Sequence, residues 1–104
     1  MKILFDQGTP APLRHELPKH SVATAFEKGW AALSNGDLLA KAEQEFDLLL
    51  TTDQNLKYQQ NLADRRIAIL VLPTTSWPKI RLHTAEIAAA VDQIKAGAYV
   101  ALVW

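Results

Sequence analysis

Six consecutive apolar residues at positions 67–72 (IAILVL) are followed directly by Pro73. A run this short, rich in β-branched side chains and ended by proline, favours a strand over a helix. Because neighbouring side chains of a strand point to opposite faces, an unbroken apolar run needs cover on both faces. Strands of this kind belong to parallel sheets that carry helices on both sides. The run therefore predicts an α/β protein.

Helix-forming segments alternate with apolar runs along the chain, as that class requires. Strands are expected at 2–5, 20–25, 46–52, 67–72 and 99–104, of which the first, third and fourth should be the most buried. Helices are expected at 10–17, with Thr9 as N-cap, from a cap at Ser34 or Asn35 to residue 45, and at 77–95, with Gly97 as C-cap. A short helix or turn is expected within 54–65. These segments predict one domain over residues 1–104, with a parallel sheet of about four or five strands.

The composition excludes several classes of protein. Eleven basic and eleven acidic residues cancel, which argues against a strong non-specific binder of nucleic acid. Cysteine is absent, so disulfides and thiolate zinc sites are excluded. Neither a signal sequence nor an apolar run of about 18 residues is visible, so we expect a cytoplasmic protein that does not enter a membrane.

Aspartates stand where two of the predicted strands end, Asp6 after KILF and Asp53 after LLLTT, and Asp37 opens a predicted helix. In parallel sheets ligands bind at the carboxyl ends of strands. Carboxylates gathered there repel one another unless a cation neutralises them, and oxygen ligands suit Mg²⁺ or Mn²⁺. The alternative is structural, since Asp37 suits a helix start and Asp6 and Asp53 suit turns.

Five polar residues near these acids are candidates for substrate binding. Side chains with neutral oxygen atoms could add ligands or hydrogen bonds, and cationic side chains could contact a phosphate. The candidates are Gln7, Arg14, Thr52, Asn55 and Lys57.

Three blocks occur in the order ILFDQGTPAPL, LSNGDLLAKAE and LLLTTDQNL. They resemble the blocks of the short single-domain PIN-like family, which includes toxins of toxin–antitoxin pairs. The resemblance implies a metal-dependent ribonuclease in which Asp6, Asp37 and Asp53 are metal ligands and catalytic residues. Gln7 and Asn55 stand where that family often has acids, so weaker metal binding is expected here.

The function that follows is hydrolysis of RNA phosphodiesters by a water activated by Mg²⁺ or Mn²⁺, with an antitoxin protein and a second copy of the chain as further partners. Two alternatives stay open. One is a catalytically silent PIN-like binding module, which the neutral Gln7 and Asn55 permit. The other is a receiver-like domain with Asp53 as phosphoacceptor and Thr74 after the fourth strand, although receivers carry adjacent acids where Asp6 is followed by Gln7.

Overall fold

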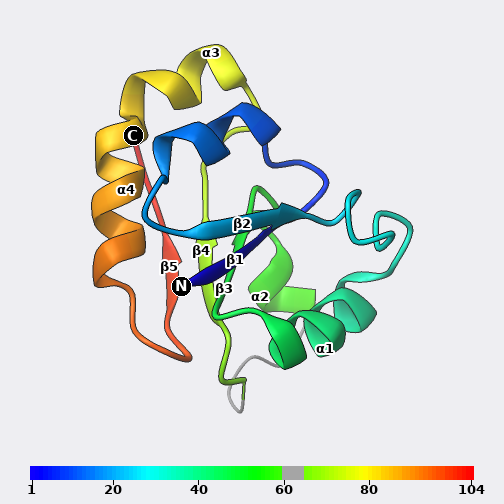
Figure 1. The fold of residues 1–104 in the computed structure, drawn as a ribbon. Helices are drawn as coiled ribbons and strands as arrows, with labels where there is room; N and C mark the ends of the chain where they lie inside the picture. The colour runs from blue at the N-terminus through cyan, green and yellow to red at the C-terminus, as the bar shows by residue number, and fades with distance from the viewer. Residues whose placement is uncertain (60–64) are drawn as a thin grey trace.

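The computed structural model describes residues 1–59 and 65–104, so part of the segment predicted at 54–65 lies outside it (Figure 1). Its centre is a five-stranded sheet in which every pairing is parallel. The strands, in the order β2-β1-β3-β4-β5, are Ser21–Thr24, Lys2–Phe5, Leu48–Thr51, Ala68–Val71 and Tyr99–Ala101. The predicted α/β class and parallel sheet are confirmed.

Helices cover both faces of this sheet (Figure 1). The α-helices are α1 (Asn35–Glu45), α2 (Leu56–Gln59), α3 (Trp77–Ile80) and α4 (Thr84–Gln93), and the 3₁₀ helices are η1 (Ala11–Glu16) and η2 (Arg81–His83). The predicted cap of α1 is confirmed, because Ser34 Oγ accepts a hydrogen bond from the backbone N–H of Asp37 at 3.3 Å. No helix in the described part of the chain is long and apolar enough to cross a membrane.

Two helix predictions are wrong in detail. The single helix predicted at 77–95 is divided into α3, η2 and α4, because His83 leaves helical geometry (φ −123°, ψ 20°). The ring of His83 stacks on Trp104 with 4.2 Å between centroids, and this tertiary contact accompanies the break. Gly97 does not cap α4, whose C-cap is Ile94, but turns the chain into β5 with φ 77°.

The segment after β1 also differs from the prediction. It forms the 3₁₀ helix η1, whose N-cap is Pro10 rather than Thr9. The Thr9 hydroxyl is turned inward instead, with acceptors on Asp6 and Leu50. Pro10 therefore caps the helix, and the Thr9 hydroxyl instead bonds to residues at the ends of β1 and β3.

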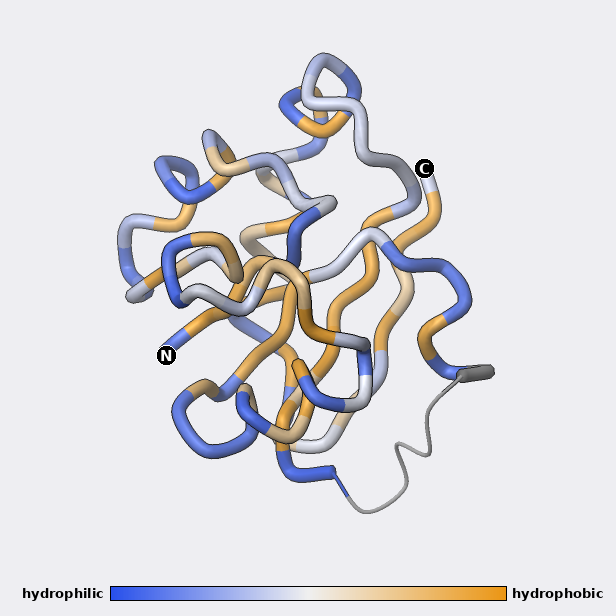
Figure 2. The backbone as a smooth tube through the Cα atoms, turned by 90° about the vertical axis from the view of Figure 1, so that its right-hand side faces the viewer, coloured by the Kyte–Doolittle hydropathy of each residue, from blue (hydrophilic) through white to orange (hydrophobic). Residues whose placement is uncertain are grey.

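The core has two halves, one on each face of the sheet. Along β1, Ile3 and Phe5 face the half built with η1, α3 and α4, while Leu4 faces the half built with α1 and α2. β3 and β4 are buried along their whole length, and β1 is buried except at Lys2, as predicted. Figure 2 shows the same arrangement, with apolar strands at the centre and polar segments outside.

The strand order reverses between β1 and β3. β1 is paired on one side with β2, which follows it in sequence, and on the other with β3. The two neighbouring ends are tied by a hydrogen bond from the Asp6 N–H to the Leu50 carbonyl at 3.1 Å. In open α/β sheets such a switch point is where ligands bind, beyond the carboxyl ends of the strands.

Candidate functional site

Asp6 lies at this switch point with its carboxylate held by two threonines. Thr9 Oγ1 donates to Asp6 Oδ1 at 2.7 Å, and Thr51 Oγ1 donates to Asp6 Oδ2. Both threonines are buried, with 5% and 1% of their surface exposed. Because a buried hydroxyl has few alternative partners, the two contacts fix the orientation of the carboxylate.

Asp53, beyond the end of β3, is held just as closely. Its Oδ2 accepts a hydrogen bond from Asn35 Nδ2 at 2.9 Å, and its Oδ1 accepts one from the backbone N–H of Asn55 at 2.9 Å. Its own N–H donates to Thr51 Oγ1 at 3.1 Å. The Thr51 hydroxyl thus contacts both residues, since it donates to the Asp6 carboxylate and accepts from the Asp53 backbone N–H.

Asp37 does not join them. No group of three or more His, Cys, Asp or Glu side chains is placed to hold a metal ion within residues 1–59 and 65–104. The convergence expected of Asp6, Asp37 and Asp53 is therefore not seen. Asp37 is exposed in the first turn of α1, about 200° around the helix from Asn35.

Asn35 is the site residue that the sequence argument missed. It is the first residue of α1, and its side-chain amide donates to the Asp53 carboxylate. A signal was available, because Asn35 precedes the buried Leu38, Leu39 and Ala42 by three, four and seven positions. That spacing places Asn35 on the helix face that is turned to the sheet, whereas Asp37 lies off it.

Gln7 and Arg14, two of the predicted binding residues, border a hollow of about 640 Å³ beside Asp6. The hollow extends from the end of β1 to the end of β2 and the start of α3. Other side chains on its wall are Thr24, Phe26, Glu27, Thr75 and Trp77. Of the two aspartates, Asp6 borders this hollow and Asp53 does not.

The guanidinium of Arg14 is engaged within this wall. It forms two hydrogen bonds with the Glu27 carboxylate, at 3.0 and 2.9 Å, and donates to the Val22 carbonyl at 2.6 Å. Glu27 Oε1 in turn accepts from the Thr24 N–H at 2.9 Å. The hydrogen bonds from Arg14 and from Thr24 lower the pKa of Glu27 to about 2. The pair therefore stays ionised at neutral pH and covers backbone groups of β2, an edge strand.

The remaining three predicted binding residues do not border this hollow. The Thr52 side chain packs on Gly8, where an added Cβ would clash with Thr52 Oγ1. Asn55 contacts Asp53 through its backbone N–H, and its side chain is exposed. Lys57 extends over the ring of Tyr99, 5.8 Å from the centroid.

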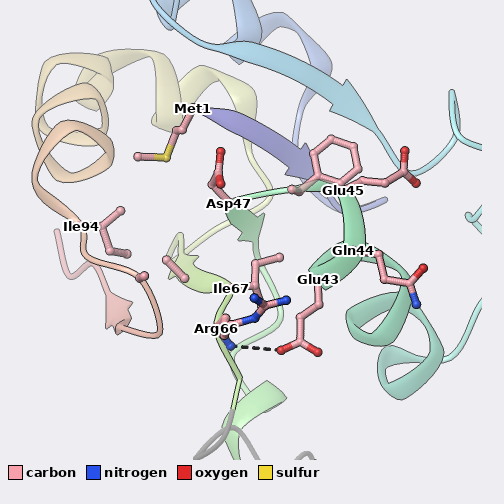
Figure 3. A pocket seen from close by; sticks show the side chains of 11 residues that line it. Met1, Glu43, Gln44, Glu45, Asp47, Arg66, Ile67 and Ile94 are labelled. Carbon is pink, nitrogen blue, oxygen red and sulfur yellow. Dashed lines mark hydrogen bonds between the residues drawn. The ribbon is translucent and has the colours of Figure 1, made fainter.

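A second hollow, of about 500 Å³, lies at the amino ends of the strands (Figure 3). Two acids on its wall accept hydrogen bonds from residues at or just before the strand starts. Glu43 accepts from Arg65 at 2.8 Å and from the Arg66 N–H at 3.1 Å, and Asp47 accepts from the Lys2 N–H at 2.8 Å. None of the predicted site residues lies there. We therefore place the candidate site at the carboxyl ends, where the switch point is.

The fold and the site define an open α/β protein with two linked aspartates at the switch point of its sheet. Comparison with protein-family models, with curated proteins and with solved structures finds no match for the chain. The PIN-like resemblance therefore rests on its three sequence blocks.

Proposed function

We propose that this chain is a Mg²⁺- or Mn²⁺-dependent ribonuclease whose site is built on Asp6 and Asp53. The observation that supports this most directly is the link through Thr51, which holds both aspartates at the end of neighbouring strands. Acidic residues fixed at a switch point are suited to bind a cation and, through it, a phosphate.

The donors available fit a weakly held hard cation. Mg²⁺ in proteins is often bound through one or two carboxylates, with water and substrate phosphate completing the shell. Asp6 and Asp53 supply two carboxylates, and the Asn35 amide beside Asp53 is a neutral third group. The proposed ligand set omits Asp37, because its side chain is exposed on another face of α1.

The chain's own residues would then have distinct tasks. Thr9 and Thr51 hold Asp6 in one orientation, and Asn35 does the same for Asp53. A bound divalent ion supplies charge neutralisation for the phosphodiester and a more acidic water. One of the two carboxylates accepts the proton of the attacking water, as a general base.

The proposal is tested by cleavage of an unstructured RNA with Mn²⁺, with Mg²⁺ and with chelator. Asp6→Asn should lose activity by orders of magnitude, since the cation loses a ligand. Asp37→Asn is the matched control, because it removes the same charge from outside the proposed ligand set and should retain most of the activity. Cleavage that persists in chelator, or that Asp6→Asn leaves unchanged, would leave the silent binding module as the better account.

The partners that the resemblance implies, RNA as substrate and an antitoxin protein as inhibitor, belong to the same proposal. So do a second copy of the chain and a cytoplasmic setting, which the resemblance does not imply. Co-purification of the chain with a protein encoded beside it would test the antitoxin directly.

One observation favours a second candidate, the phosphoacceptor domain. The strand order 2-1-3-4-5 is that of flavodoxin-like sheets, a group that includes receiver domains. Asp53 follows β3 and Thr74 follows β4, as that activity needs. Against it, receiver domains carry adjacent acids after the first strand, where Asp6 is followed by Gln7. Labelling with acetyl phosphate, and its loss in Asp53→Asn, would establish this candidate.

A further inference from the structure

Two aromatic side chains border the hollow beside Asp6. Phe26, in the loop after β2, has 80% of its surface exposed. Trp77, at the start of α3, is half buried, packing against the core as well as bordering the hollow. Large rings on the wall of an open pocket provide surface for a planar ligand.

The charges of the wall indicate which part of a nucleotide belongs there. Arg14 and Glu27 neutralise each other through their paired hydrogen bonds, which leaves Asp6 as the uncompensated charge among the lining residues. A phosphate placed in the hollow would be repelled by Asp6, whereas an uncharged ring would not. Gln7, Thr24 and Thr75 add an amide and two hydroxyls, which can donate to and accept from the polar edge of a base.

We infer that this hollow is a nucleobase subsite, in which a base of single-stranded RNA packs on Phe26 and Trp77 while its phosphate lies outside, at the cation proposed for Asp6. The volume, about 640 Å³, is within the range of small-molecule pockets and leaves room for a base and its ribose. Stacking accepts any base, so weak sequence preference is expected. The inference rests on the proposed function for the position of the phosphate, but not for the occupancy of the hollow.

Free nucleosides test the subsite without metal, phosphate or catalysis. Adenosine and uridine are titrated in chelator into the ¹⁵N-labelled chain, followed by ¹H–¹⁵N spectra. The expected result is a shift of the Trp77 indole N–H and of the Gln7 side-chain amide, absent or much reduced in Phe26→Ala. Leu82→Ala is the control, since Leu82 is 75% exposed and borders another hollow. Shifts centred on Trp104 and His83, or none up to the solubility limit, would overturn the inference.

A second measurement uses a fluorescein-labelled single-stranded RNA. With Mn²⁺, Phe26→Ala should raise the KM for cleavage, or the Kd for binding, by about 5- to 150-fold, because one stacked base is lost. The kcat should change little. The two proposals fail separately. Nucleosides that bind a chain with no metal-dependent cleavage would refute the ribonuclease and keep the subsite. Metal-dependent cleavage with a KM that Phe26→Ala leaves unchanged would refute the subsite and keep the ribonuclease.

Discussion

Replacing Asn35 by aspartate would place a third carboxylate at the site. The amide nitrogen that now donates to Asp53 at 2.9 Å would become a carboxylate oxygen. The hydrogen bond to the charged group, about 1.5–3 kcal/mol, would be lost. Two carboxylates relaxed to about 4 Å would also repel by roughly 1 kcal/mol in water and up to about 4 kcal/mol in a less polar setting.

Because Asp53 is partly exposed, we take the repulsion near its value in water, and we expect Asn35→Asp to lower the free energy of unfolding by about 2.5–4 kcal/mol in chelator. For a chain of 104 residues that is a fall in Tm of about 10–20 °C. A divalent cation shared by the acids should reverse the effect, since a ligand at about 100 times its Kd stabilises the folded state by about 2.7 kcal/mol.

The assay is thermal unfolding by circular dichroism, in chelator and across a Mn²⁺ titration. Asn35→Ala is the matched control, because it removes the same hydrogen bond to Asp53 without adding a carboxylate, so Mn²⁺ should raise its Tm no more than that of the wild type. If Mn²⁺ raised the Tm of Asn35→Asp by no more than that of the wild type, the proposed position of the cation would be refuted.

Three further outcomes are expected. The pKa of Glu27 is lowered to about 2 from 4.5, so its contribution to stability is present above pH 4.5 and is lost as the pH falls toward 2. Glu27→Gln should therefore flatten the curve of unfolding free energy against pH over this range. A curve that the substitution leaves unchanged would contradict the ion pair. Thr9→Val removes the hydroxyl that donates to Asp6 and Leu50, so the free energy of unfolding, measured with urea, should fall by about 1–3 kcal/mol. Gly8→Ala forces Thr52 aside, so the Tm should fall, whereas Gly29→Ala, in open space but at φ 77°, serves as a control for backbone strain alone.

The sheet could be predicted because its signal is local. The apolar run at 67–72 and the three consecutive leucines at 48–50 favour burial on both faces, and the structure has β3 and β4 fully buried. The order of the strands could not be predicted in the same way, because an apolar run does not specify its neighbour. The break at His83 coincides with stacking of its ring on Trp104, a contact between distant parts of the chain that helical periodicity does not contain.

The candidate site was predicted in part for a related reason. Asp6 and Asp53 follow directly from strand ends, and the structure links them through Thr51. Asp37 was predicted as a site residue because it is acidic. Which residue of α1 contacts Asp53, however, is decided by the helix face that is turned to the sheet, and that face carries Asn35. The hollow with Phe26 and Trp77 forms only where β2, η1 and α3 meet, so no single segment of sequence predicts it.

The β2 edge of the sheet is protected against pairing with a strand of another copy. Adding β5 of one copy to β2 of the next would repeat without closing and give a fibre. At β2, however, Arg14 already donates to the Val22 carbonyl and Glu27 accepts from the Thr24 N–H, so an incoming strand finds these groups taken. The ion pair between Arg14 and Glu27 therefore opposes end-to-end growth of the sheet at this edge.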